Sequence, residues 1–141
     1  VTIQAQILDL MRNLQEQFGS AIMMITHNLG VINETSDRIA VMYLGKIVEV
    51  AERRTLFKRP AHPYTVGLLQ SVPEMGNEAR TRLHPVPGII PDPFNVPKGC
   101  AFYARCPIKN KKESCKDPDG IPLVEVEPDH MVRCTLYTET G

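Results

Sequence analysis

The chain contains 141 residues, of which 43% are hydrophobic, 23% charged and 6% aromatic, and its sixteen Lys and Arg balance sixteen Asp and Glu. This composition is typical of a globular protein and excludes a disordered chain. A formal net charge of zero argues against nucleic-acid binding, which needs an excess of Lys and Arg on one face. The longest apolar runs, 21–25 and 39–44, are far shorter than the roughly 20 residues that cross a bilayer, so no membrane-spanning segment is expected.

The N-terminal segment has the pattern of an amphipathic helix. Apolar residues recur every three or four positions from Ile3 to Phe18, and Gly19 follows as the expected stop. The sequence starts with Val1, inside this pattern, and no secretory signal opens it. We therefore expect a piece of a longer protein of the reducing cytosol.

The next segments predict an α/β arrangement. Residues 21–25 are apolar without a break, which favours a short strand covered on both faces, as in a parallel sheet. Thr26 or Asn28 can cap a following helix over 29–36. Strand-like runs at 39–43 and 47–50 flank a tight break at Gly45 and predict an antiparallel hairpin.

A change of composition predicts where the chain divides. Short helices are expected over 53–58 and 64–71, the second entered through Pro63. Six of the twelve prolines then lie between Pro73 and Pro97, a density that favours an extended connection. We expect three parts: residues 1–72, a proline-rich linker over 73–99 and a C-terminal segment over 100–141.

The four cysteines all lie in the C-terminal segment, spaced C-x5-C-x8-C-x18-C: Cys100, Cys106, Cys115 and Cys134. The segment has little apolar material beyond a strand-like run at 123–126, so we expect a covalent or metal staple. Without a C-x2-C pair, zinc, an iron–sulfur cluster, two disulfides and free structural thiols all remain open. Positive charge near the first three cysteines favours thiolates. It comes from Lys98, Arg105, Lys109, Lys111, Lys112 and Lys116.

Histidines supply the other candidate functional groups. His27 lies between the predicted strand at 21–25 and the helix after it, where open α/β sheets place ligand-binding groups. A neutral imidazole at a helix N-terminus can donate a hydrogen bond to a phosphate, and the alternative is a satisfied, partly buried histidine. His62 is interpreted as part of a proline-entered helix start, and His84 and His130 have loop-like neighbours.

Several segments occur in a recognisable order: 1–10, 25–31, 37–49, His62-Pro63-Tyr64-Thr65, Gly99-Cys100-Ala101-Phe102 and Arg105-Cys106-Pro107. In this order they resemble the ATP-binding subunit of bacterial oligopeptide and dipeptide ABC transporters, the peptide/nickel branch, over nearly the whole chain. The resemblance implies the C-terminal part of a P-loop ABC nucleotide-binding domain. Its elements are a parallel strand, helices and an antiparallel hairpin, followed by a loop-rich four-cysteine extension.

The resemblance also implies a function and partners. Such a subunit uses ATP and Mg²⁺ to power peptide import, together with transmembrane permease subunits, a second ATP-binding subunit and, indirectly, a peptide-binding protein. It lies in the cytoplasm on the inner face of the membrane. His27 matches the switch-loop histidine, which contacts the ATP γ-phosphate and helps to hold the attacking water. Asn28 stands where the family usually has Asp, and Ala51 where it usually has Gly.

For the cysteine segment, the resemblance implies a [4Fe–4S] cluster on Cys100, Cys106, Cys115 and Cys134, with zinc as the alternative. Its role would be structural or redox-sensing. A competing hypothesis is a free-standing iron–sulfur or zinc module with a redox or regulatory function.

The sequence holds no G-x-x-x-x-G-K-[ST] phosphate loop, no ABC signature and no acidic Mg²⁺-binding strand. We therefore expect that this chain alone neither binds ATP tightly nor hydrolyses it. A truncated α/β half also leaves a sheet edge uncovered, so self-association of the chain is a further expectation.

Overall fold

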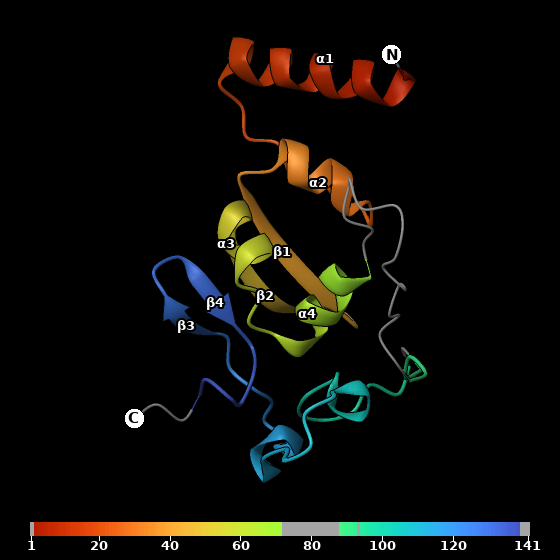
Figure 1. Ribbon diagram of the computed structural model, residues 1–141, viewed down its shortest axis with the longest axis vertical. Coiled ribbons are helices and arrows are strands. Elements are labelled where there is room, and N and C mark those ends of the chain that lie inside the picture. The colour runs from red at the N-terminus through yellow and green to blue at the C-terminus, as the bar shows by residue number, and fades with distance from the viewer. Residues whose placement is uncertain (1, 72–87, 93, 139–141) are drawn as a thin grey trace. The chain divides into compact units, whose positions relative to one another are not determined.

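The computed structural model describes residues 2–71, 88–92 and 94–138 (Figure 1). The chain divides into two compact units, Val1–Ser36 and Asp37–Gly141, and each is described by itself. Within the described part of the chain, no helix has the length and apolar character that crossing a membrane requires.

The first unit contains two helices with side-chain caps. Helix α1 (Ile3–Phe18) begins where the Thr2 side chain accepts a hydrogen bond from the Ala5 N–H, and it ends at Gly19 in the left-handed region with φ 60°. Helix α2 (Leu29–Thr35) begins at Asn28, whose side chain accepts the N–H groups of the second and third helical residues. Both helices confirm the predictions from apolar spacing and capping residues.

The predicted strand at 21–25 is wrong for this structure. These residues have no regular secondary structure, and the side chains of Met23 and Ile25 are 89% and 92% exposed. A parallel strand needs neighbouring strands to accept and donate its backbone hydrogen bonds. In the described residues of this unit no strand is available as a neighbour, so the apolar run stays extended and unpaired.

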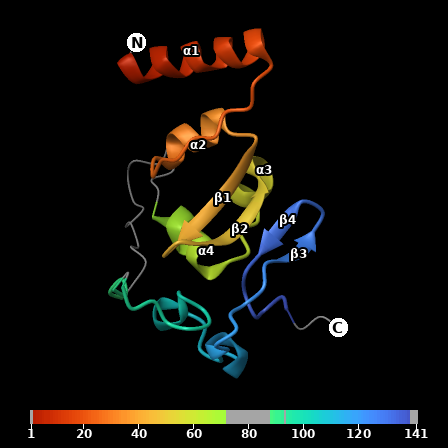
Figure 2. The same cartoon turned by 180° about the vertical axis from the view of Figure 1, so that it is seen from behind.

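The second unit is built on a four-stranded antiparallel sheet (Figures 1 and 2). Its strands are β1 (Arg38–Tyr43), β2 (Lys46–Glu52), β3 (Val124–Glu127) and β4 (His130–Val132), in the order β1-β2-β4-β3. Leu44 and Gly45 join β1 to β2 with φ values of 45° and 77°, the positive pair that a type I′ hairpin turn requires. The predicted hairpin is therefore confirmed.

Two short helices cover one face of the hairpin: α3 (Arg53–Lys58) and α4 (Pro63–Gln70) (Figures 1 and 2). Strand β1 alternates exposed and buried side chains along its length, as expected for a strand with one face on a core. The core contains Tyr43 from β1, Leu56 from α3 and Phe102 from the C-terminal segment, all at most 5% exposed. The rings of Tyr43 and Phe102 meet edge to face at 5.3 Å.

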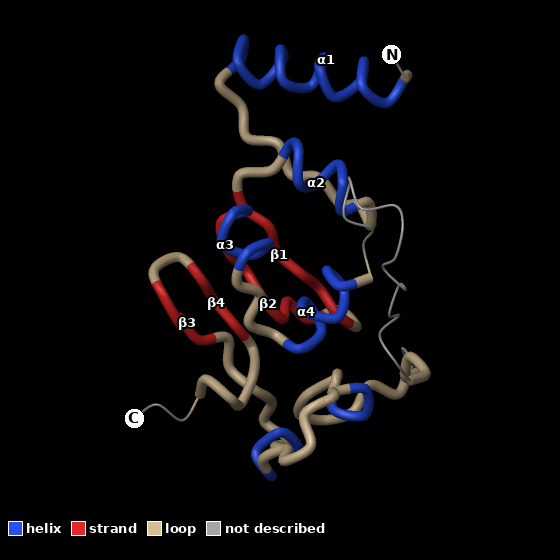
Figure 3. The backbone as a smooth tube through the Cα atoms, in the orientation of Figure 1, coloured by secondary structure: helices blue, strands red, loops and turns tan. Residues whose placement is uncertain are grey.

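The C-terminal segment is mostly loop with two single-turn helices, η1 (Tyr103–Arg105) and η2 (Glu113–Lys116) (Figure 3). Strand β3 matches the run expected at 123–126, whereas β4 was not predicted. Strand β4 pairs with β2. The C-terminal segment therefore adds the β3–β4 hairpin to the sheet that β1 and β2 begin. Most of the predicted proline linker lies outside the described residues, and the division at 73–99 stays a prediction.

Candidate functional sites: a histidine turn and a four-cysteine pocket

His27 occupies the turn that leads into α2. Its side chain is exposed, and it lies beside a hollow lined by α1 and by residues 24–28. The hydroxyl of Thr26 accepts a hydrogen bond from the Asn28 N–H at 3.0 Å, and Asn28 in turn caps α2. The turn is thus fixed on both sides of His27, and the imidazole is accessible to a ligand.

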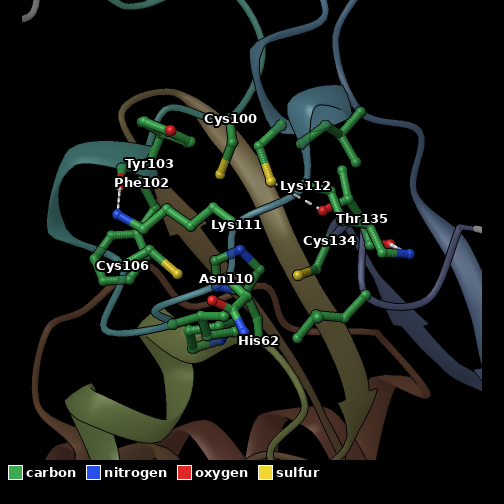
Figure 4. Close-up of a pocket in the computed structure, with 15 residues that line it drawn as sticks. His62, Cys100, Phe102, Tyr103, Cys106, Asn110, Lys111, Lys112, Cys134 and Thr135 are labelled. Carbon is green, nitrogen blue, oxygen red and sulfur yellow. Dashed lines mark hydrogen bonds between the residues drawn. The ribbon is translucent and has the colours of Figure 1, made fainter.

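The four cysteines line one pocket in the second unit (Figure 4). Cys100 precedes η1, Cys106 follows it, Cys115 lies in η2 and Cys134 comes two residues after β4. All four are free thiols. The folded chain therefore brings together the four residues that the sequence singled out, from three separate segments.

The glycine before Cys100 makes the approach of two segments possible. Gly99 has a φ of 83°, and a Cβ built on it would lie 2.5 Å from the Cys115 carbonyl oxygen and 2.9 Å from the Lys116 carbonyl carbon. The same approach allows the Cys100 N–H to donate to the Cys115 carbonyl at 2.8 Å. Only glycine combines this backbone conformation with so close a contact.

Two lysines and a threonine that line the pocket form hydrogen bonds with neighbouring segments. Lys111 donates to the Tyr103 carbonyl at 2.7 Å and lies 4.6 Å from the centre of its ring, while Lys112 donates to the Thr135 carbonyl at 3.2 Å. The Thr135 hydroxyl lies 3.0 Å from the Cys115 sulfur. Both ammonium groups thus donate to backbone carbonyls of residues that line the pocket, and their effect on the thiols stays a prediction.

The surroundings of Cys100 and Cys134 raise the pKa of both thiols. Burial, with smaller contributions from the neighbouring Cys100, Cys106 and Cys115, raises the pKa of Cys134 to about 11. Burial also raises the pKa of Cys100, with Cys115 and Cys106 contributing in the same direction. A metal must therefore displace protons to bind here, so its affinity will increase with pH.

The pocket differs from a site for one metal ion. Among the described residues, no three His, Cys, Asp or Glu side chains are close enough to hold a single ion. The cavity has a volume of about 20 Å³, room for about one water molecule. The zinc site considered from the sequence is thus not preformed.

Three polar residues in or near this pocket are at most 1% exposed: Glu49, His62 and His130. From the sequence, His62 is interpreted only as part of a helix start and His130 as loop-like, and Glu49 is not singled out. Glu49 lies in β2 between Val48 and Val50 in the sequence and is itself fully buried. A carboxylate inside an apolar strand is the one signal that could have pointed to this cluster, because such a group needs partners when buried.

Comparison of the sequence with known proteins points to one family. The family described as the C-terminal region of the oligopeptide/dipeptide transporter matches residues 48–115. The oligopeptide transport ATP-binding protein AppD of Bacillus subtilis is 45% identical over 141 residues, all of this chain and 42% of that protein. AppF of the same organism is 44% identical over 142 residues, covering 98% of this chain and 42% of that protein.

The chain is therefore similar over nearly its whole length to peptide-transporter ATP-binding subunits, and its residues 48–115 match the model of their C-terminal region. It spans about two fifths of the length of the relatives named above. The hypothesis of a free-standing metal module finds no support in these matches.

Proposed function

We propose that the chain forms the C-terminal part of an ATP-binding subunit that powers peptide import by an ABC transporter. The observation that carries this proposal is the similarity of the whole chain to oligopeptide transport ATP-binding proteins. ATP and Mg²⁺ would be bound largely by residues outside these 141, which contain no phosphate loop. The partners proposed are permease subunits, a second ATP-binding subunit and, indirectly, a peptide-binding protein, at the inner face of the cell membrane.

Within such a subunit, His27 is proposed as the switch histidine for the ATP γ-phosphate. Its exposed ring and the capped turn around it support this role, since a phosphate ligand needs an accessible donor with a fixed backbone. The uncharged Asn28 keeps the capping function at the position where the family usually has Asp.

A chimera tests both statements. The corresponding C-terminal region of AppD is replaced by this chain, and peptide uptake and ATP hydrolysis are measured. We expect the chimera to retain both activities, and His27→Ala to lower hydrolysis about 100-fold or more with little change in nucleotide affinity. The exposed Asn13→Ala on α1 is a control expected to leave hydrolysis unchanged. Hydrolysis that survives in His27→Ala would remove the switch role, and a chimera without uptake would count against the transporter assignment.

We further propose that Cys100, Cys106, Cys115 and Cys134 hold a [4Fe–4S] cluster. Four free thiols on one pocket support it, because each iron of such a cluster takes a separate cysteine and the thiols need not converge on one ion. The donors fit in kind and number, whereas the small cavity requires the pocket to open when the cluster enters. A bound cluster would supply covalent cross-links among three loop segments.

Metal and acid-labile sulfide analysis of anaerobically purified chain, with a visible absorption spectrum, tests the cluster. We expect iron with matching sulfide, and loss of both in Cys134→Ser. Zinc without iron, or no metal with paired disulfides, would contradict the cluster and leave the transporter assignment intact.

A further inference from the structure

We propose that Glu49 is a positioning residue for the cysteine pocket, acting through the turn at Ala61 and His62 to fix the backbone that carries Cys134. This inference rests on the proposed role of the four cysteines and adds the residue that positions one of them. The contacts that carry it all lie in the second unit. They run from β2 through the start of α4 to the residues on both sides of Cys134.

The carboxylate of Glu49 organises the turn. It is fully buried, one oxygen accepts the Ala61 N–H at 2.8 Å and the other accepts the His62 N–H at 2.9 Å. His130 at the start of β4 adds a third contact, with its Nε2 2.7 Å from the first oxygen. A buried carboxyl group with three partners restrains the geometry of those partners, since displacing any of them leaves a buried polar oxygen with fewer hydrogen bonds.

The turn then holds the residue before Cys134. The Nδ1 atom of His62 accepts the Tyr64 N–H at 3.0 Å, so the ring proton is on Nε2. The backbone of Arg133, the residue before Cys134, lies close enough to the ring to raise the pKa of His62 against the larger effect of burial. The Arg133 N–H in addition donates to the Val48 carbonyl of β2 at 2.8 Å.

The turn also holds the residues after Cys134. The Tyr137 hydroxyl donates to the Ala61 carbonyl at 3.3 Å, and the Tyr137 N–H donates to the Cys134 carbonyl at 3.0 Å. Cys134 is thus bracketed by two connections to the same two-residue turn. Because Glu49 accepts both N–H groups of that turn, its carboxylate sets where the Cys134 thiol lies in the pocket wall.

Selective alkylation of Cys134 tests this inference. The reduced, metal-free 141-residue chain is treated with iodoacetamide, and the rates at Cys134 and Cys100 are followed by mass spectrometry. Glu49→Gln keeps the shape of the side chain but replaces one acceptor oxygen by a donor. We expect the ratio of the Cys134 rate to the Cys100 rate to increase about tenfold, because the wall carrying the buried thiol opens locally.

Two further variants separate positioning from general destabilisation. His62→Asn keeps a helix-capping side chain but loses the ring contact to Arg133, so the same ratio is expected to increase in that variant too. Glu52→Gln, at the exposed end of β2, is the matched control and should leave the ratio unchanged. Equal acceleration at all the cysteines, or an unchanged ratio in folded variants, would overturn the proposal.

If Glu49→Gln fails to fold by far-UV circular dichroism, Tyr137→Phe decides, because it removes the hydroxyl that contacts Ala61 and keeps the aromatic ring. An increased ratio in that variant supports the proposal and an unchanged ratio refutes it. The measurement needs no metal, so absence of a cluster would defeat the cluster proposal without altering the alkylation result.

Discussion

Two buried histidines in this chain have different surroundings and therefore different chemistry. His130 lies between carboxylates, with Nε2 2.7 Å from Glu49 and Nδ1 3.2 Å from Glu127. His62 accepts a backbone N–H at Nδ1 and is enclosed by the aromatic core, with its ring 5.9 Å from that of Phe102. Burial lowers the pKa of His62 from 6.5 to about 4, although nearby Glu49 opposes the shift.

The pKa of His62 predicts a loss of stability in mild acid. The unfolded chain takes up a proton near pH 6.5 and the folded chain only near pH 4, so the unfolded state binds more protons between these values. The contribution of His62 to the free energy of unfolding should therefore be fully present above pH 6.5. It should fall by about 3 kcal/mol as the pH decreases toward 4. Urea unfolding at pH 7 and pH 4.5 checks this prediction. The His62→Asn variant should lose less free energy of unfolding between these two pH values than the original chain. Equal losses in both proteins would contradict it.

At Thr65 we expect a substitution to stabilise the protein. Its side chain is fully buried, and its hydroxyl is the one buried side-chain polar atom without a hydrogen-bond partner among the described residues. Thr65→Val keeps the shape and removes the unsatisfied group, so we expect a gain of about 1 kcal/mol in the free energy of unfolding. Thermal unfolding measures it. A clear loss of stability would show that the hydroxyl has a partner after all.

The sequence could predict the chemistry-bearing residues only in part. The clustering of the four cysteines pointed to one site because their spacing lies within a single short segment. The Glu49–His130 contact joins residues 81 positions apart, and nothing local to either residue signals the other. His130 looks like a loop residue by its neighbours, yet it begins β4 and is 1% exposed.

Elements with local causes were predictable, and elements with remote causes were not. The capped helices α1 and α2 and the β1–β2 hairpin depend on apolar spacing, capping residues and one turn. Strand β4 has three residues and exists because β2 and β3 pair with it. For residues 21–25 the apolar run predicted a strand, but the described part of this unit supplies no second strand to pair with it.

Two glycines give a matched test of how closely the elements of the cysteine segment approach. Gly99 and Gly120 both have positive φ, 83° and 86°, but only the Cβ of a substituted Gly99 would meet backbone atoms, at 2.5 Å. Gly120→Ala should cost about 1 kcal/mol from backbone conformation alone. Gly99→Ala should cost about 1–3 kcal/mol more, because η2 must move away from Cys100. Denaturant unfolding of the two variants checks the difference, and equal costs would refute the close approach.

On the scale of the whole molecule, helix α1 carries a long apolar surface that the rest of the first unit does not bury. No residue of α1 is buried, and its apolar side chains are between 42% and 77% exposed at Ile3, Ile7, Leu10, Leu14 and Phe18. The relatives are more than twice as long as this chain, which covers 42% of them. A contiguous exposed patch of this kind usually marks a surface that contacts other protein.

This surface predicts that the 141-residue chain self-associates through α1. Leu10 and Phe18 lie two turns apart on the apolar face, 57% and 68% exposed, so Leu10→Gln with Phe18→Gln removes apolar area without disturbing a core. We expect sedimentation velocity to show concentration-dependent association of the original chain and its reduction in the double variant. Phe94→Gln, at a 98% exposed residue outside α1, serves as the control and should associate like the original chain. If the control reduces association as much as the double variant does, or if the original chain is monomeric at all concentrations, the α1 face does not drive self-association.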